Sequence, residues 1–383
     1  MRRKRRWLTA ALIGAVLIAV LWIPATRYWR AAEFLSALSA PRPAPASQAR
    51  SSLVAAPADI VERELLITGS DGPIRARLYR PARGANGRGM VVAHGVHYQG
   101  IDERRLVPFV RELTRTGLVV LTPELAELAD YRITPQGVSV IADAVRFLSA
   151  EPGLERHRGR PARVGLLGFS FAGGLSLVAA ADPEIGARLS FVTSVGGHHD
   201  LTRVLRFLIR DELDTPDGRR HVKAHDYGLV VLTYGYLERF VPEADLDVMR
   251  QALRLWLRED RRGALAAASL RTTLAGERLW TLLEAGNLRV LAPELEAIAR
   301  ERSAELAALS PRGRLRSIRA PVYLLHGSHD SVIPPSELEW ASLELGSSEH
   351  EALVSPLLDH VEVSREATFR DELALLHFMT HIL

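Results

Sequence analysis

Residues 163–174 read Arg-Val-Gly-Leu-Leu-Gly-Phe-Ser-Phe-Ala-Gly-Gly, and this stretch decides the fold that we predict for the chain. An apolar run ends here and a helix-like segment begins, with Ser170 at the junction. A serine at a tight strand-to-helix turn has a strained backbone that exposes its hydroxyl, so its flanking positions must be small. The stretch therefore predicts Ser170 as a nucleophile, with Gly168 and Ala172 as the small residues that shape its turn.

The composition excludes several classes of function. Residues 1–50 hold nine Arg or Lys and one Glu, so that of 49 basic and 45 acidic residues in all, 40 and 44 remain in the rest of the chain. That part is mildly acidic, and we expect no nucleic-acid surface on it, because such surfaces need clustered basic residues. The chain has no cysteine, which excludes disulfides, thiol nucleophiles and cysteine-based metal sites.

The N-terminus has the pattern of a membrane segment. A basic stretch ends at Arg6, and residues 7–23 carry no charge. Seventeen residues span about 26 Å as a helix, at the short end of what crosses a bilayer. We predict that residues 1–30 form a basic N-terminus with a single transmembrane anchor. The Pro/Ala-rich residues 31–58 are predicted as a linker.

The charge bias of this segment predicts the location of the protein. Five basic residues precede the apolar run and two follow it closely, which favours an N-terminus in the cytoplasm and a catalytic domain outside it. The Arg-rich, Lys-poor composition suggests a bacterium, and hence its cytoplasmic (inner) membrane. Cleavage as a signal peptide, giving a secreted or periplasmic protein, is the alternative.

From residue 59 onward, short apolar runs alternate with amphipathic segments. This pattern predicts an α/β fold: a mostly parallel, eight-stranded sheet with helices on both faces. The core is predicted to comprise 59–197 and 319–383. The expected strands are 61–67, 74–79, 90–93, 118–121, 164–167, 190–195, 322–325 and 350–354, and the expected helices are 102–116, 136–149, 171–181, 336–345 and 364–382.

Between residues 198 and 318 the strand signals stop, and Leu, Ala, Arg and Glu recur at helical spacing. We predict an inserted helical cap over this interval. Because a cap of this kind covers the end of the sheet where active residues gather, it is expected to decide the substrate.

A nucleophilic serine needs a general base and a carboxylate that orients the base. Asp330 follows a predicted strand within His326-Gly327-Ser328-His329-Asp330, and His360 lies on the loop before the final helix. Their order along the chain and their places after strands predict Asp330 as the orienting acid and His360 as the general base. Asp359 is the rival acid, but side chains of sequence neighbours rarely meet.

Backbone N–H groups must also stabilise the oxyanion. We predict that Phe171, at the N-terminus of the helix after Ser170, gives one N–H group. Val96 is predicted to give the second, because it follows a strand and a Gly95 that permits a sharp turn. His94 and Gly95 are expected to shape this loop rather than to react.

Ser170, Asp330 and His360 in this order, with His94-Gly95 after the third strand, resemble the α/β-hydrolase superfamily. The resemblance covers residues 60–383. Within the superfamily, the chain is similar to serine esterases and to dienelactone-hydrolase-like and serine aminopeptidase-like members. The resemblance implies a serine hydrolase that cleaves carboxylic esters through an acyl-enzyme intermediate, without a cofactor. Peptide or amide hydrolysis, acyl transfer, and a non-catalytic binding module are the alternatives.

His198-His199-Asp200 follow the sixth predicted strand and invite a metal-site interpretation. Adjacent histidines diverge, however, so one metal ion rarely binds both. We predict no metal site, and treat His198 and His199 as possible substrate contacts. The expected partners are a small-molecule or lipid-like ester and the membrane through residues 7–23; the sequence leaves the oligomeric state open.

Overall fold

A computed structural model of the chain describes residues 26–38, 59–156, 160–359, 362–363 and 368–383. The predicted anchor at residues 7–23, most of the predicted linker and the predicted base His360 lie outside these ranges. No helix among the described residues has both the length and the apolar character needed to cross a membrane.

The core of the fold is an eight-stranded sheet in the order β1-β2-β4-β3-β5-β6-β9-β10. β1 and β2 are antiparallel, as are β2 and β4, and the remaining neighbours are parallel. All eight predicted strands are present, so the predicted α/β fold with a mostly parallel sheet is confirmed. The strands are β1 (Ile60–Gly69), β2 (Gly72–Pro81), β3 (Gly89–Ala93), β4 (Val119–Pro123), β5 (Val164–Phe169), β6 (Leu189–Val195), β9 (Val322–Gly327) and β10 (His350–Ser355).

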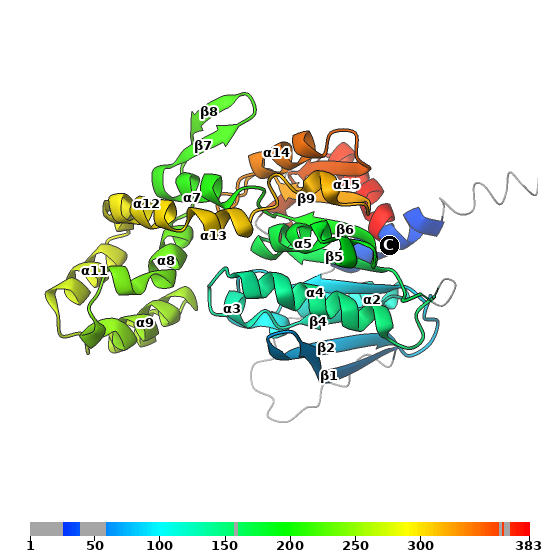
Figure 1. Cartoon of the computed structure of the whole chain (residues 1–383), viewed down its shortest axis with the longest axis horizontal. Helices are drawn as coiled ribbons and strands as arrows, with labels where there is room; N and C mark the ends of the chain where they lie inside the picture. The colour runs from blue at the N-terminus through cyan, green and yellow to red at the C-terminus, as the bar shows by residue number, and fades with distance from the viewer. Residues whose placement is uncertain (1–25, 39–58, 157–159, 360–361, 364–367) are drawn as a thin grey trace, which may run out of the picture.

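The central strands are buried on both faces, because helices cover the sheet on either side (Figure 1). In β3, Val91 and Ala93 belong to one apolar cluster, the first cluster, while Met90 and Val92 belong to another, the second cluster. This alternation is the period of two that a strand imposes on its side chains. It explains why the central strands read as unbroken apolar runs.

Helices α4, α5 and α14 pack into the first cluster, and α2 and α15 into the second. The five predicted core helices are therefore present, with ends shifted by a few residues in three of them. The core helices are α2 (Leu106–Arg115), α3 (Ala126–Ala129), α4 (Pro135–Ala150), α5 (Phe171–Ala181), α6 (Pro183–Gly186), α14 (Ser336–Leu345) and α15 (Phe369–Ile382), with a 3-10 turn η1 (Gly100–Asp102).

The beginning of the predicted linker is not a spacer. Residues 26–38 form a helix, and within it Ala31 and Phe34 are buried in the second cluster. The Phe34 ring meets the edge of Phe109 with the ring centroids 5.4 Å apart. The linker prediction is thus wrong for residues 31–38, because their apolar side chains pack against the core.

Between β6 and β9 the chain forms the predicted helical region, which stands to one side of the sheet (Figure 1). The prediction that strands stop here is wrong at one place: β7 and β8 form an exposed hairpin. Its signal was the turn sequence Pro-Asp-Gly at 216–218, with Gly218 at φ +127°. The elements are α7 (Leu201–Arg210), β7 (Glu212–Thr215), β8 (Gly218–His221), α8 (Asp226–Gly235), η2 (Leu237–Arg239), α9 (Glu243–Leu257), α10 (Arg261–Ala268), α11 (Leu274–Glu284), η3 (Leu288–Leu291), α12 (Ala292–Glu301), α13 (Ser303–Ala308) and η4 (Leu315–Ser317).

Candidate active site

Ser170 lies at the turn between β5 and α5 and has a strained backbone, with φ +53° and ψ −133°. A positive φ is rare for a residue with a side chain, and this one lies outside even the ordinary left-handed helical region. Such strain costs about 1–3 kcal/mol and persists only where the surroundings enforce it. Here the Ser170 N–H donates to Val195 O (2.7 Å), and the Ser170 carbonyl accepts from Gly173 N–H (2.8 Å). The side chain is only partly buried.

The residues around Ser170 have no room for larger side chains. A Cβ at Gly168 would clash with the Ala172 carbonyl oxygen and with Ser176 Oγ. Ala172 itself is fully buried. A Cβ at Gly95 would lie 3.1 Å from the Cβ of Ser170, which shows how closely the β3 loop approaches the serine. The structure therefore brings together Gly168, Ala172, Gly95 and Ser170.

The predicted oxyanion donors lie at the two loops that meet at Ser170. Phe171 is the first residue of α5, and Val96 follows Gly95. Within the described part of the chain, the N–H groups of Phe171 and Val96 have no hydrogen-bond partner. The first N–H groups of a helix lack intrahelical acceptors and favour negative charge. Both groups are thus available for an oxyanion near Ser170.

His94 braces the loop that carries Gly95 and Val96. Its Nε2 accepts the Leu125 N–H (2.9 Å), so the proton is on Nδ1, which donates to Gly95 O (2.8 Å). Burial lowers the pKa of His94, against the opposing effect of Glu124, whose Oε1 lies 3.7 Å from Nε2. A neutral ring with both nitrogens occupied holds a loop and does not exchange protons.

Asp330 is held by the loop after β9. Its Oδ1 accepts the N–H groups of Val332 (2.9 Å) and Ile333 (3.0 Å), which fixes the plane of the carboxyl group. Its Oδ2 lies 3.5 Å from His326 Nε2, and that nitrogen donates to Ile333 O (2.8 Å). His326 therefore braces this loop, and the carboxylate is pre-oriented by the backbone.

The end of β6 brings Ser170 and Asp330 together. Val195 accepts the Ser170 N–H, and the next residue, Gly196, faces the Asp330 carboxylate: a Cβ at Gly196 would lie 3.6 Å from Oδ2. Adjacent Cα atoms are about 3.8 Å apart, so the serine and the acid flank the same short piece of backbone. This contact was not predictable from the sequence, because nothing local links position 196 to position 330.

His360, the predicted base, lies outside the described residues, as does the residue after it. The described residue Leu358 is close to the acid loop, since a Cβ at Gly327 would clash with its carbonyl oxygen. The described residues before and after His360 pair with each other: β11 (Leu358–Asp359) is antiparallel to β12 (Glu362–Val363). The chain on either side of His360 is therefore near the loop that carries Asp330.

His198 and His199 are buried and bound to protein groups. His198 Nε2 donates to Leu309 O (3.0 Å), and its ring occupies the space where a Cβ of Gly174 would be. His199 Nε2 donates to Glu344 (2.7 Å), and its Nδ1 accepts from Arg203 (3.0 Å). Both ring nitrogens of His199 are thus used within the protein, which argues against the predicted substrate contact there.

A buried carboxylate that the sequence did not reveal organises this region. Glu337 is fully buried on α14, and its Oε2 accepts the N–H groups of His199 and Asp200 at 2.8 Å each. Arg203 compensates its charge, with Nε 2.5 Å from Oε1. Asp200 caps α7 and pairs with Arg312 (2.7 Å). Asp200 is thus committed to this network and is no substitute for Asp330.

No protein-family model matches the sequence, and neither does any curated protein. Many solved structures are similar, and three of them show the range of the likeness. The acylaminoacyl peptidase of Pyrococcus horikoshii is 13% identical over 85% of this chain and 40% of its own, with a TM-score of 0.43. An esterase of Pyrobaculum calidifontis is 14% identical over 94% and 90% (TM-score 0.46). A 2,6-dihydroxy-pseudo-oxynicotine hydrolase is 17% identical over 84% and 68% (TM-score 0.45). Likenesses this distant do not assign a function, which must come from the site.

Proposed function

We propose that this chain, whose sheet order and serine turn are those of the α/β-hydrolase fold, is a serine hydrolase that cleaves carboxylic esters. The observation that carries the proposal is the backbone of Ser170, at φ +53° and ψ −133° between β5 and α5. A buried turn adopts such a conformation only under constraint, and strain of this kind is concentrated at functional sites. The same turn places a serine hydroxyl at the top of the sheet in this fold.

In the proposed mechanism, Ser170 Oγ attacks the ester carbonyl and transfers its proton to His360. The N–H groups of Phe171 and Val96 stabilise the oxyanion of the tetrahedral intermediate. His360 then protonates the leaving alcohol, which leaves an acyl group on Ser170. Water, deprotonated by His360, attacks the acyl-enzyme; His360 returns the proton to Ser170 Oγ as the acyl–oxygen bond breaks, and the acyl group leaves as a carboxylic acid.

Asp330 acts through His360 in this scheme. The two backbone N–H groups on Oδ1 orient the carboxylate, and we assign Oδ2 to the His360 ring. A carboxylate in this position keeps the histidine in the tautomer that accepts the serine proton and stabilises its charged form. Nothing in the scheme requires a cofactor.

The region between β6 and β9 is proposed to select the substrate. Its helix α8 carries the buried Tyr234, whose ring lies 6.0 Å from that of Tyr131, a buried residue that follows α3 in the core. Apolar and aromatic side chains of this kind suit contact with the acyl or alcohol part of a small-molecule or lipid-like ester.

We further propose attachment to the bacterial cytoplasmic (inner) membrane through residues 7–23, with the catalytic domain outside the cytoplasm. In the helix that follows, Tyr28 and Trp29 are exposed, Trp29 by 68%. Aromatic residues of this kind are enriched at the interface between membrane and water. Release of the protein from membranes by carbonate would contradict an integral anchor.

The test of the enzymatic proposal is labelling with a fluorophosphonate, which reacts with activated serines. Wild type is expected to label stoichiometrically and Ser170→Ala not at all. Ser269→Ala, which changes an exposed serine at the end of α10, serves as the matched control and is expected to label like wild type. Turnover of an ester series should fall at least about 10³-fold in Ser170→Ala.

Other results would favour the alternatives. Labelling of Ser170 together with turnover of peptides or amides, but not esters, would make the protein a peptidase or amidase. Transfer of the acyl group to an added alcohol in preference to water would make it an acyltransferase. A folded wild type that neither labels nor turns over any substrate would refute catalysis and favour a binding module.

A further inference from the structure

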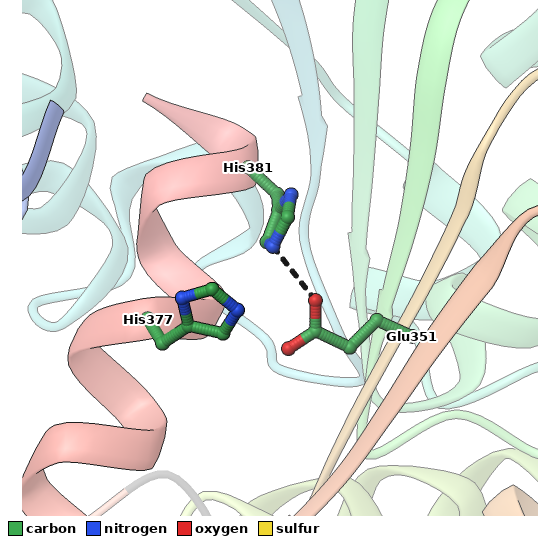
Figure 2. A group of neighbouring side chains, drawn as sticks. All are labelled: Glu351, His377 and His381. Atoms are coloured by element: carbon green, nitrogen blue, oxygen red, sulfur yellow. Dashed lines mark ion pairs between the residues drawn. The ribbon is translucent and has the colours of Figure 1, made fainter. Parts of the chain in front are cut away.

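Two histidines and a glutamate converge at the far end of the sheet from Ser170. His377 and His381 lie four residues apart on α15, and Glu351 extends from the beginning of β10 (Figure 2). One potential ligand atom from each of the three lies within 4.8 Å of the other two. Residues four apart on a helix share a face, so both imidazoles point toward the strand.

We propose that Glu351, His377 and His381 bind a divalent transition-metal ion, for which Zn²⁺ is the best match. Two imidazoles at i and i+4 and one carboxylate are a ligand set that Zn²⁺ uses, with a fourth position left for water. In a tetrahedral site the ligand atoms lie about 3.3 Å apart, given metal–ligand distances of about 2.0–2.1 Å. Small side-chain rotations bring the three atoms to that spacing.

The contact between His381 and Glu351 supports a cation between them. His381 Nε2 lies 2.8 Å from Glu351 Oε2, which is close enough for an ion pair. The same Nε2 is buried, yet has no partner with hydrogen-bond geometry among the described residues. A carboxylate oxygen this close to an imidazole nitrogen, without hydrogen-bond geometry between them, is an arrangement in which both atoms can bind one cation at a point beside them. A metal ion at that point would satisfy both.

His377 is already held in an orientation that suits a ligand. Its Nδ1 lies 2.5 Å from the Tyr28 hydroxyl, and one of its ring nitrogens is directed toward Glu351 and His381 (Figure 2). If Nδ1–H donates to the tyrosine oxygen, Nε2 keeps its lone pair for a metal ion. Tyr323 stacks on the His381 ring with centroids 5.2 Å apart and fixes that ring as well. Such outer contacts are typical of metal-binding histidines.

The position of the site separates it from the proposed ester hydrolysis. Glu351 pairs with Tyr323 near the start of β9, whereas Asp330 follows the end of that strand. Glu351 also precedes Ser355, at the end of β10, by four residues, about 13 Å along a strand. The ion would join α15, β10 and, through Tyr28, the helix of residues 26–38. We therefore expect it to stabilise the fold without entering the reaction.

The test uses the full-length, untagged chain in mild detergent, stripped of metal with a chelator and titrated with Zn²⁺ alone. Wild type is expected to bind about one Zn²⁺ per chain. His377→Gln, His381→Gln and Glu351→Gln should each weaken binding at least about 10-fold. His221→Gln, which changes an exposed histidine on β8, is the matched control and should bind like wild type.

A second measurement keeps the proposal testable if a variant does not fold. Zn²⁺ should raise the unfolding temperature of wild type by a few degrees, and a chelator should reverse the rise. Co²⁺ bound to wild type should show the visible absorption of a tetrahedral site. The proposal is overturned if wild type binds no Zn²⁺ in competition with a chelator, or if the three ligand variants bind it as tightly as His221→Gln does.

Discussion

The two ends of the sheet bring functional side chains together in different ways. At the proposed catalytic end, where the parallel strands finish, Ser170 and Asp330 flank the backbone after β6. At the opposite end, Glu351, His377 and His381 converge between β10 and α15. The first arrangement depends on backbone strain and backbone hydrogen bonds, and the second on side chains of two elements that meet. The geometry of the proposed catalytic site is thus fixed by loops, whereas that of the proposed metal site is fixed by packing.

The largest effect is expected from Asp330→Asn, which should lower turnover strongly and leave Zn²⁺ binding at the opposite end of the sheet unchanged. We expect kcat to fall roughly 10³- to 10⁴-fold, because an amide no longer holds the base in the required tautomer. Oδ1 can still accept the N–H groups of Val332 and Ile333, so the fold should be preserved. The measurement is steady-state kinetics on an ester, beside thermal unfolding and Zn²⁺ titration.

The matched control for this variant is Asp247→Asn, on the exposed side of α9, which should keep wild-type kinetics. Unchanged turnover in Asp330→Asn would remove Asp330 from the mechanism. In that case Asp359 would be the next acid to replace.

A smaller effect, on both stability and rate, is expected from Gly168→Ala. The added methyl group would clash with the Ala172 carbonyl oxygen and Ser176 Oγ, and overpacking of this kind costs about 1–3 kcal/mol of the free energy of unfolding. A shift of Ser170 by about 1 Å would lower the rate of acylation about 10²-fold. Denaturant unfolding and fluorophosphonate labelling rates would measure the two effects.

Gly235→Ala in α8 provides the contrast, since a Cβ there meets no atom within 4 Å. Alanine is a better helix former than glycine, so this variant should be neutral or slightly stabilised. If Gly168→Ala behaves in the same way, the turn at Ser170 is not sterically constrained.

The remaining prediction concerns pH and the buried histidines near the proposed catalytic end of the sheet. Burial lowers the pKa values of His94, His198 and His199 below about 6.5, the value in the unfolded chain. Below that pH the unfolded chain takes up protons that the folded chain does not. The contribution of these neutral histidines to the free energy of unfolding is therefore complete above about pH 6.5. It declines as the pH falls toward the folded pKa values, by up to about 1.4 kcal/mol per pH unit for each histidine.

Unfolding temperatures between pH 8 and pH 5 would measure this decline. In His198→Gln the slope should be shallower than in wild type, because one of the three groups is absent. The exposed His221→Gln should retain the wild-type slope. Equal slopes in all three proteins would show that His198 does not contribute to the pH dependence.

The sequence predicted the strands and the core helices because apolar periodicity follows directly from burial on one or two faces. It failed at residues 31–38, whose Ala and Ser composition resembles a linker although Phe34 is buried. It also missed the hairpin β7–β8, whose strands are short and charged. Residues 31–38 pack against a distant part of the chain, and the hairpin stays largely exposed. Neither segment has the apolar periodicity from which the other elements were predicted.

By itself the sequence determined the sheet, the strained position of Ser170 and the order of the candidate catalytic residues, because each depends on neighbours a few positions away. Tertiary structure decided which side chains share a site. Gly196 lies beside Asp330, Glu337 binds the backbone of His199, and Glu351 meets His381 only because the chain folds back over long intervals. The spacing of His377 and His381 was visible in the sequence, but a third ligand becomes evident only when β10 packs against α15.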